Sequence, residues 1–490
     1  MIELIQSGKP LSLRQKIALT AKLSWPAIMA QLSSILMQYI DAAMVGRLGA
    51  DDSASVGLVS TSLWLFWGIC SAATVGFSVQ IAHRVGAGDY KTARSVLRQA
   101  IPSAFCFGLF MAIIGVAISP FLPLWLGGEG YVAEQSTVYF MIFVAALPLL
   151  TMNYLGCASL RASGNMKIPG GMNILMCVLD VIFNFLLIFP SHTFDVFGFV
   201  ITIPGANLGV LGAAVGTVAA ETVCASLVML YLCRYEKGLA IWGKLCEDVK
   251  SVSSRMFRPT RKVLSNALKV SAPMTLEHAV ICGAQIMVTV IVAPLGVMAI
   301  AANSFAVTAE ALCYMPGYGI ADAATTLTGQ SYGAGRKDLA KSFGYITVVS
   351  GMIIMTLMGV IMWIFAPAVM QLFTPIEQIA ELGIHSLRIE AWAEPMFAAS
   401  IVAYGVMIGV GDTIVPAIMN FGSIWLVRLP LAAILAPTMG LAGVWTAMCI
   451  ELCFRGFIFL WRLIKGSWLK HGLDTSSLSN IADSQTNPDV

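Results

Sequence analysis

The chain has 490 residues, of which 58% are hydrophobic and only 11% are charged, with a formal net charge of +3. Soluble proteins carry about 25% charged residues, so this composition excludes a soluble globular enzyme or binding module. Apolar runs of 18 or more residues recur along almost the whole chain. They indicate an all-α, multi-pass membrane protein in contact with the lipid bilayer. We expect no nucleic-acid partner and no cofactor.

Twelve transmembrane helices are predicted. In chain order they cover approximately 17–45, 53–82, 95–118, 131–155, 168–190, 208–232, 263–292, 299–328, 342–366, 384–408, 414–436 and 440–464. The stretch before the first helix lacks the basic, apolar and small-residue order of a cleaved signal peptide, so we expect this helix to be retained.

Charged residues separate the loops into two kinds. One set of alternate loops is basic and holds Lys9, Arg14, Lys16, Lys22, Arg84, Lys91, Arg94, Arg98, Arg161, Lys167, Arg336, Lys337, Lys341, Arg462, Lys465 and Lys470. The other set holds Asp51, Asp52, Glu129, Glu134, Asp195, Glu377 and Glu381. The positive-inside rule therefore predicts that both termini are cytoplasmic. We expect the protein to be a monomer in the plasma (inner) membrane.

An internal repeat with an offset of 247 residues relates the two halves. It superposes Pro26 on Pro273, Gly86-Ala87-Gly88 on Gly333-Ala334-Gly335, Pro120 on Pro367 and Pro148 on Pro395. Each repeat holds six spans, which is an even number, so both halves cross the membrane in the same sense. The sequence thus predicts two six-helix lobes related by a pseudo-two-fold axis along the membrane normal, as in transporters built from parallel repeats.

The repeat also suggests where the lobes begin and end. We expect an N-lobe at 1–232, a basic cytoplasmic linker at 233–262, a C-lobe at 263–470 and a disordered tail at 471–490. After residue 173 the offset falls to 231, since Gly209 and Gly212 recur at Gly440 and Gly443. The extra residues of the first half predict a β-hairpin or extended loop outside the membrane, near 190–206.

Polar residues in the N-lobe form the principal candidate site. Gln31, Ser34, Gln38 and Asp41 lie on one face of the first span, because their spacing is 3, 4 and 3 residues. Depth counting places Asp41 of span 1, Asp180 of span 5 and Thr217 of span 6 at similar depth, and Asn184 lies one turn above Asp180 on the same face. Buried acids in a membrane are costly. Two of them can bind Na⁺ at Asp41 and Asp180 or share a proton; alternatively, each is paired structurally with a hydroxyl or backbone group.

The second half lacks these acids, because Asp41 falls on Val288 and Asp180 on Val427. The candidate substrate or gating residues are Gln31, Ser34, Pro26, Glu277, Glu310, Glu390, Glu394 and Arg428. Arg428 needs a glutamate partner, and a structural pair is favoured over a substrate contact. Pro26 and Pro273 can kink or start their helices. The two Gly-Ala-Gly runs follow no strand and precede no Gly-Lys-Ser/Thr, which excludes a nucleotide site and an ATP-driven pump.

These motifs resemble the multidrug and toxic compound extrusion (MATE) family over spans 1–12. The resemblance is carried by QYIDAAMVGRLG with Asp41, VQIAHRVGAGDYKTA, SLRASGNMKIP, VLDVIFNFLLIF with Asp180, GVLGAAVGT with Thr217 and LTGQSYGAGRKDLA. It implies two lobes around a central cleft that exchange a drug-like, often cationic substrate for Na⁺ or H⁺. It also implies that Asp41, Asp180 and Thr217 form the cation site.

The chain departs from the family at several positions. Met176 stands where one branch has an asparagine, although Asn184 follows Asp180 by one turn. Ile281 and Phe397 stand where another branch couples through acids, and Ile408 stands opposite Arg161 in the repeat. The resemblance is therefore to the branch that couples through the N-lobe.

Three functions stay open. The leading hypothesis is a cation-coupled antiporter that exports drug-like organic compounds by alternating access. A flippase for lipid-linked or polysaccharide precursors is the alternative, and it predicts a basic cavity. An intramembrane carboxylate enzyme is disfavoured because hydrolysis has no use for two duplicated lobes, so we expect no catalytic activity.

Overall fold

The structure is a computed structural model that describes residues 2–6, 9–196, 199–242 and 257–474. Most of the predicted tail and the centre of the predicted linker lie outside these residues. Of the linker, 233–242 and 257–262 are described; of the tail, only 471–474.

The first half of the chain contains nine helices and one hairpin within the described residues. In order these are α1 (Ile2–Gln6), α2 (Leu13–Gly46), α3 (Ala50–Gly86), α4 (Tyr90–Ile118), α5 (Leu122–Trp125), α6 (Gly130–Ala145), α7 (Leu147–Ala162), α8 (Lys167–Ile188), β1 (Pro190–Val196), β2 (Phe199–Ala206) and α9 (Val210–Arg234).

The second half repeats this order without a hairpin in its described part. It contains α10 (Arg261–Val292), η2 (Ala293–Leu295), α11 (Val297–Gly333), α12 (Lys337–Phe373), α13 (Glu377–Glu390), α14 (Glu394–Val410), α15 (Ile414–Ser423), η3 (Ile424–Arg428), α16 (Leu429–Met439), α17 (Leu441–Lys465) and η4 (Ser467–Leu469).

Twelve membrane-spanning units follow from these helices. Among the described residues, nine units are long and apolar enough to cross a bilayer. Two helix pairs qualify together but are bent, α6 and α7 by 47° and α13 and α14 by 61°. The twelfth is α17, whose 25 residues measure roughly 37 Å at about 1.5 Å per residue. The predicted all-α architecture of twelve spans is confirmed.

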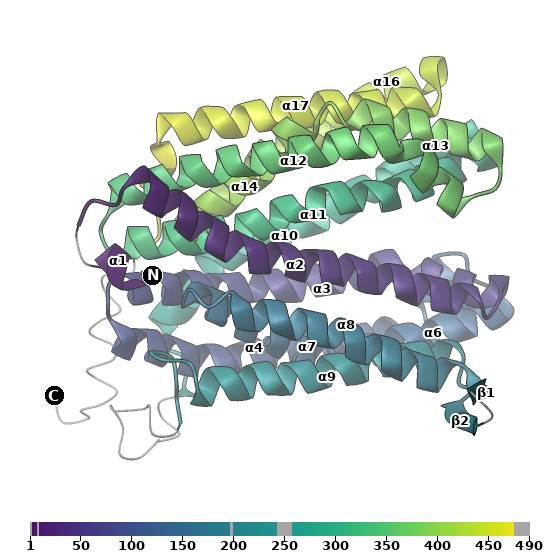
Figure 1. The fold of residues 1–490 in the computed structure, drawn as a ribbon, viewed down its shortest axis with the longest axis horizontal. Coiled ribbons are helices and arrows are strands. Elements are labelled where there is room, and N and C mark those ends of the chain that lie inside the picture. Colours follow the sequence, from purple (N-terminus) through teal and green to yellow (C-terminus); the bar gives the residue numbers. More distant parts are fainter. Residues whose placement is uncertain (1, 7–8, 197–198, 243–256, 475–490) are drawn as a thin grey trace.

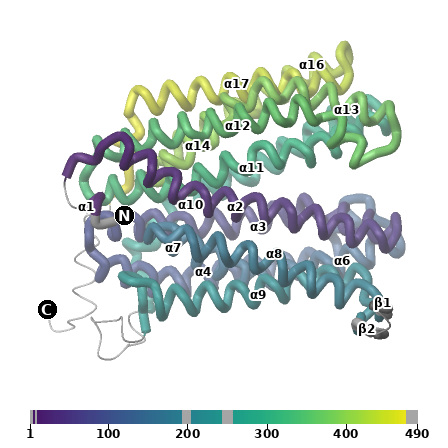
Figure 2. Tube along the Cα trace, viewed as in Figure 1, coloured from purple at the N-terminus to yellow at the C-terminus, as the bar shows by residue number. Residues whose placement is uncertain are grey.

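The helices form two lobes side by side, α2–α9 and α10–α17, as predicted (Figures 1 and 2). The first helix of each lobe lies at the interface between them. α2 packs against α8 of its own lobe and α11 of the other, and α10 packs against α3. Because α2 corresponds to α10 and α3 to α11 in the repeat, these two contacts are the same contact made twice.

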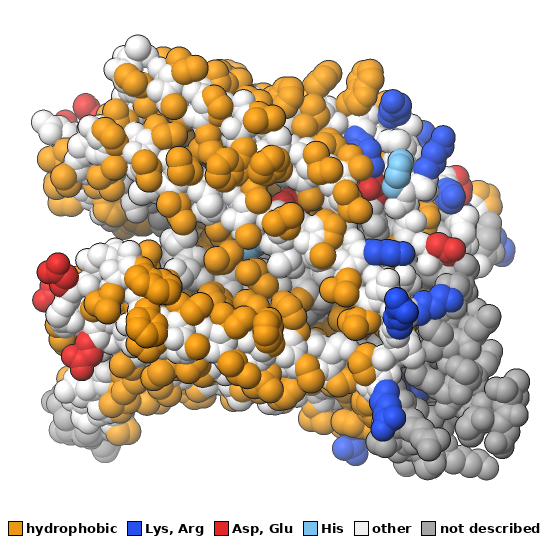
Figure 3. Space-filling view, turned by 180° about the vertical axis from the view of Figure 1, so that it is seen from behind, with side chains coloured by type: hydrophobic (Ala, Val, Ile, Leu, Met, Phe, Trp, Pro, Cys, Tyr) orange, Lys and Arg blue, Asp and Glu red, His pale blue; other side chains and the backbone are white. Residues whose placement is uncertain are grey.

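Charges gather at the two ends of the helices. Figure 3 shows Lys and Arg gathered at one end, where some Asp and Glu also lie, only Asp and Glu among the charged side chains at the other end, and a largely apolar band between them. We call these the basic end and the acidic end. At the acidic end the surface is hollowed between the lobes (Figure 3). The β1–β2 hairpin lies at the end away from α1 (Figure 1). Its antiparallel pairing from Pro190↔Ala206 to Val196↔Phe199 matches the predicted insertion.

Two glycines bring the lobes into backbone contact at the basic end. A Cβ on Gly86 of α3 would lie 2.0 Å from the carbonyl oxygen of Gln330 on α11, and a Cβ on Gly333 would lie 2.0 Å from that of His83. Both pairs of positions, 83 with 330 and 86 with 333, differ by 247. Glycine is therefore required here because any side chain would hold the two lobes apart.

The side chains of His83 and Gln330 add two hydrogen bonds to this contact between the lobes. We call the contact the interlobe seam; it consists of His83, Gly86, Ala162, Gln330, Gly333 and Gly409. His83 Nε2 donates to the Gly409 carbonyl at 2.9 Å, and Gln330 Nε2 donates to the Ala162 carbonyl at 2.8 Å. Positions 162 and 409 also differ by 247. The repeat therefore builds one polar contact twice, around the pseudo-two-fold axis.

The two prolines near the basic end lie inside helices rather than at their starts. α2 begins at Leu13 and continues through Pro26, and α10 begins at Arg261 and continues through Pro273. The prediction that these prolines could start their helices is wrong. The capping box of Ser12 and Gln15 sets the start of α2 thirteen residues earlier than the proline.

Candidate functional site

One asparagine side chain, that of Asn184, joins the three N-lobe residues that the sequence placed at similar depth. Asn184 Nδ2 donates to Asp41 Oδ1 at 2.9 Å, to Asp180 Oδ2 at 3.2 Å and to Thr217 Oγ1 at 3.4 Å. These residues come from α2, α8 and α9. An amide group has two hydrogens for these three acceptors, so the oxygens retain capacity for another donor or for a cation.

Two oxygens of this site are buried without a hydrogen-bond partner. Asp180 and Asn184 have no exposed surface, and in the described part of the chain Asp180 Oδ1 and Asn184 Oδ1 have no partner. Gly216 on α9 makes room for the amide, because a Cβ there would lie 2.1 Å from Asn184 Oδ1. Unpaired buried acceptors are costly, so this arrangement is suited to receiving a ligand that supplies positive charge.

The chemistry of the oxygens limits that ligand to a hard cation or a proton. The site offers two carboxylates, one amide and one hydroxyl, and oxygen donors suit hard cations. Among the described residues there is no group of three or more His, Cys, Asp or Glu that could hold a metal ion.

The N-lobe site opens on a cavity of about 510 Å³. Asp41, Asn184 and Thr217 line it, and so does the predicted polar stripe of α2, Gln31, Ser34 and Gln38. Its other walls include the aromatic side chains of Trp64, Trp67, Tyr139, Phe143 and Tyr154. This volume lies in the range of pockets that hold drug-sized molecules, so an organic molecule here would lie directly beside Asp41, Asn184 and Thr217.

A second cavity of about 370 Å³ lies against the C-lobe and contains Glu277. The Glu277 carboxylate accepts hydrogen bonds from the Tyr404 hydroxyl and from Asn420 Nδ2, both in the C-lobe. Ile281 and Phe397, the positions where another branch of the family carries acids, also line this cavity. In this cavity Glu277 is held by neutral donors, and the two positions where that branch carries acids hold apolar side chains.

Arg428 pairs with a glutamate, as expected, and the partner is Glu451. Arg428 Nε and Nη2 donate to Glu451 Oε2 at 2.9 and 2.6 Å. Glu451 Oε1 lies 3.1 Å from Arg455 Nε and accepts a hydrogen bond from Ser423. The π-helical turn η3 ends at Arg428. Glu451 is fully buried and is held by Arg428, Ser423 and the Arg455 ion pair, although Arg455 Nε makes no hydrogen bond within the described residues. Such a buried network fits a structural pair.

The three remaining acidic candidates, Glu310, Glu390 and Glu394, lie apart from both large cavities. All three are buried. Glu390 ends α13 and Glu394 begins α14, on the two sides of the 61° bend. The carboxylate oxygens of Glu390 and Glu394 have no hydrogen-bond partner within the described residues.

Removing Arg428 is expected to destabilise the C-lobe. Arg428→Met leaves the buried Glu451 with one cationic neighbour, and breaking a buried ion pair costs about 3–5 kcal/mol. We expect a lower thermal unfolding midpoint of the detergent-solubilised protein. Lys465→Met, at an exposed position near the end of α17, is the matched control and should leave the midpoint unchanged. Equal midpoints for both variants would contradict a structural role for the pair.

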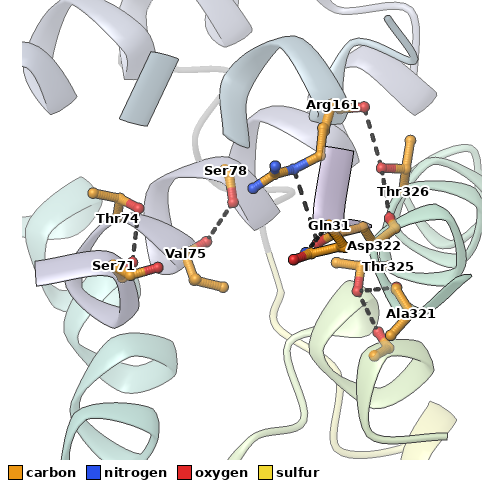
Figure 4. Close-up of polar contacts among 11 residues, drawn as sticks. Gln31, Ser71, Thr74, Val75, Ser78, Arg161, Ala321, Asp322, Thr325 and Thr326 are labelled. Atoms are coloured by element: carbon orange, nitrogen blue, oxygen red, sulfur yellow. Dashed lines mark hydrogen bonds and ion pairs between the residues drawn. The ribbon is translucent and has the colours of Figure 1, made fainter. Parts of the chain in front are cut away.

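A further acid, Asp322, lies in the predicted eighth span and was not among the predicted site residues. Asp322 Oδ1 lies 3.9 Å from Arg161 Nε, and its Oδ2 accepts a hydrogen bond from Gln31 Nε2 at 3.3 Å (Figure 4). Gln31 was predicted as a substrate or gating residue, but Arg161 was not. The signal was available, because an acid inside a predicted span is a functional candidate by default.

Both halves of the chain match the same protein-family model. A family model described as MatE matches residues 26–186 and again residues 273–434. The second match starts at 273 and the first at 26, so their separation is the 247 residues of the internal repeat. The two matches together cover more than half of the chain.

Individual relatives match over nearly their full length. A probable multidrug resistance protein NorM from Thermotoga maritima is 25% identical over 456 residues, which cover 93% of each chain. A protein of the same description from Pseudomonas aeruginosa is 26% identical over 431 residues, covering 86% of this chain and 84% of that one. A solved MOP superfamily transporter from Pyrococcus furiosus superposes with a TM-score of 0.83 at 22% identity, covering 96% of this chain and 98% of that one. This last likeness concerns the fold.

Proposed function

The chain belongs to the MatE family, and from that premise we propose that it is a cation-coupled antiporter that exports drug-like organic compounds by alternating access. It is a multi-pass membrane transport protein rather than an enzyme. The observation that carries the proposal is the N-lobe site, where two buried, unpartnered oxygens lie beside a cavity of drug size. Its close relatives in sequence are described as multidrug resistance proteins.

The distribution of charge supports an orientation with the basic end in the cytoplasm. Lys and Arg gather at that end (Figure 3), and cytoplasmic loops are enriched in these residues. Both termini would then be cytoplasmic, in the plasma membrane. The cavity would open to the outside and be closed on the cytoplasmic side by the interlobe seam. The proposal includes the predicted division into an N-lobe at 1–232, a linker at 233–262 and a C-lobe at 263–470. It also includes a monomeric state of the protein.

The charges that line the two large cavities favour organic cations as substrates. The acidic residues there are Asp41, Glu221, Glu277 and Asp322, whereas the arginines are Arg161 and Arg455. Arg455 is already paired with Glu451. A net negative surface attracts cations and repels the polyanionic precursors that a flippase would carry.

Ion binding can move the lobes because α2 contacts both. Near its acidic end α2 carries Asp41, which is bonded to the N-lobe through Asn184. The same helix contacts the C-lobe through Gln31, which donates to Asp322, and through Tyr39, which donates to the Thr308 carbonyl. A cation or proton bound at Asp41 and Asp180 changes the charge where α2 is attached to the N-lobe, and leaves its attachments to the C-lobe unchanged. We propose that this change shifts α2 against α11 and drives the exchange between the two facing states.

Efflux from proteoliposomes under separately imposed Na⁺ and proton gradients tests the proposed function. A fluorescent lipophilic cation such as ethidium is the probe, and an ionophore that collapses the gradient is the control. We expect one of the two gradients to accelerate efflux and the ionophore to remove the acceleration. Efflux that is indifferent to both gradients would overturn the proposal. The gradient that accelerates efflux identifies the coupling ion.

A further inference from the structure

The ion pair between Asp322 and Arg161 lies at the floor of the central cleft and joins the two lobes. Asp322 is on α11 of the C-lobe, and Arg161 is near the end of α7 in the N-lobe. Figure 4 shows the two side chains pointing toward each other, with Gln31 of α2 beside the carboxylate. Thr326, one turn beyond Asp322, donates to the Arg161 carbonyl at 3.2 Å. The pair therefore bridges the lobes where they approach each other.

Asp322 faces all the space inside the cleft. It lines the 510 Å³ cavity, the 370 Å³ cavity and a smaller one of about 170 Å³ at the closed end. Its side chain is 30% exposed and that of Arg161 is 28% exposed. The shortest distance between them, 3.9 Å, is too long for a hydrogen bond. The carboxylate is thus held loosely and remains open to another cation.

The repeat shows that this ion pair is not needed for closing the lobes. Positions 161 and 322 correspond to 408 and 75, which are Ile408 and Val75. These two belong to an apolar cluster with Val79 and Val270. The contacts of the interlobe seam occur at both sets of repeat-related positions. The ion pair occurs at one set only, and the residues at the other set are apolar. A structural closure would work with apolar residues on both sides, so the charges serve another purpose.

We propose that Asp322 binds the cationic group of an organic substrate and that Arg161 is its intramolecular competitor. When the lobes separate at the basic end, Arg161 leaves with the N-lobe and Asp322 is left unpaired at membrane depth, where a carboxylate attracts a cation. When the lobes close, the Thr326 contact returns the Arg161 backbone to α11, and the guanidinium competes for Asp322. The substrate cation is then displaced toward the outer cavity.

The surroundings of Asp322 define the class of ligand. Trp64 and Trp67 line the larger cavity, and Tyr318 and Phe397 line the C-lobe cavity. Aromatic faces bind organic cations by cation–π contact. The ligand is therefore a monovalent cation with an apolar or aromatic body, such as a quaternary ammonium or phosphonium. This inference rests on the proposed export function, and it identifies Asp322 as the residue that selects substrates by their positive charge.

Binding of tetraphenylphosphonium to the purified protein tests the role of Asp322. Asp322→Asn should weaken this binding by about ten-fold or more, which corresponds to about 1.4 kcal/mol, and Asp322→Glu should restore most of it. Binding of a neutral drug of similar size should change little in Asp322→Asn, because it makes no charge contact with this side chain. Unchanged phosphonium binding in Asp322→Asn, or equal loss for the cation and the neutral drug, would overturn the assignment.

Export kinetics test the role of Arg161. Arg161→Gln removes the competitor, so KM for ethidium export should fall and kcat should fall with it, because release slows. In Arg161→Gln with Asp322→Asn, KM should return to that of Asp322→Asn alone. A raised KM in Arg161→Gln would overturn the competition. Asp41→Asn, assayed in parallel, separates the two proposals. Normal export in Asp41→Asn would contradict the coupled function. Loss of export in Asp41→Asn, together with unchanged phosphonium binding in Asp322→Asn and a raised KM in Arg161→Gln, would contradict only this inference.

Discussion

Gradient-driven export is expected to be abolished in Asp41→Asn, while the protein still inserts and folds. Asparagine has the shape of aspartate, so the contact with Asn184 and the packing of α2 against α8 are kept. The negative charge is lost, and with it the attraction for Na⁺ or the ability to take up a proton. A hydrogen bond to a charged group contributes up to about 3 kcal/mol, so we expect efflux to fall by roughly 100-fold.

Efflux of ethidium from proteoliposomes under the accelerating gradient measures this effect. Ser33→Ala is a matched control on the same helix, because the Ser33 hydroxyl donates to the Met29 carbonyl of α2 itself. The control should export normally. Asp180→Asn should behave like Asp41→Asn, since the Asn184 amide joins both carboxylates. Undiminished export in Asp41→Asn would rule out the N-lobe site as the coupling site.

Gly333→Val and Gly86→Val are each expected to prevent closure of the basic end. The added side chain would begin 2.0 Å from a backbone oxygen of the opposite lobe, and backbone on long helices cannot shift far enough to avoid it. The lobes should then stay apart at the seam, and export should fall by at least about ten-fold because the outward-facing state is not reached. The two variants should be nearly equivalent, since the contact is built twice.

Hydrogen exchange at the backbone amides of 83–88 and 330–335 reports closure independently of export. Faster exchange at both segments in either variant is the expected result. Gly171→Val, on α8, provides the control, because a Cβ at Gly171 meets nothing within 4 Å. Its exchange at the seam and its export should be those of the unaltered protein. Full export together with unchanged exchange in Gly333→Val would show that the seam is not a moving part.

Most of the scaffold could be predicted because membrane helices obey strong constraints on length and polarity. The twelve predicted spans overlap the observed helices, but α3 and α11 extend farther at their basic ends, α12 extends farther at its other end, and spans 4 and 10 are bent helix pairs that were not predicted. The extensions of α3 and α11 form the seam, and hydropathy gives no signal for them. The hairpin was predicted by a change in the repeat offset alone, without any strand pattern.

The N-lobe site could be predicted because the depth of a residue in the membrane and its face on a helix both follow from counting residues along the sequence. These two quantities placed Asp41, Asp180 and Thr217 at similar depth and Asn184 one turn from Asp180, and the structure brings all four together. What spacing could not show is that Asn184 stands at the centre, bonded to all three others. That depends on Gly216, whose missing side chain admits the amide.

The C-lobe was harder to predict because its contacts depend on helix irregularities. The π-helical turn at Ile424–Arg428 shifts the helical register, so the partner of Arg428 could not be found by counting residues. Asp322 was missed for a different reason. Its role depends on Arg161 from the other lobe, and a repeat that places Val75 and Ile408 at the matching positions gives no hint of that pairing.

Coupled flux separates this mechanism from a channel, a flippase or a passive pore. Substrate efflux and ion uptake should be recorded together in the same proteoliposomes, for the unaltered protein and for Asp180→Asn. We predict that each molecule of ethidium exported is accompanied by uptake of a fixed number of Na⁺ ions or protons, and that both fluxes disappear together in Asp180→Asn. Efflux that continues without any ion uptake would contradict cation-coupled antiport through the N-lobe site.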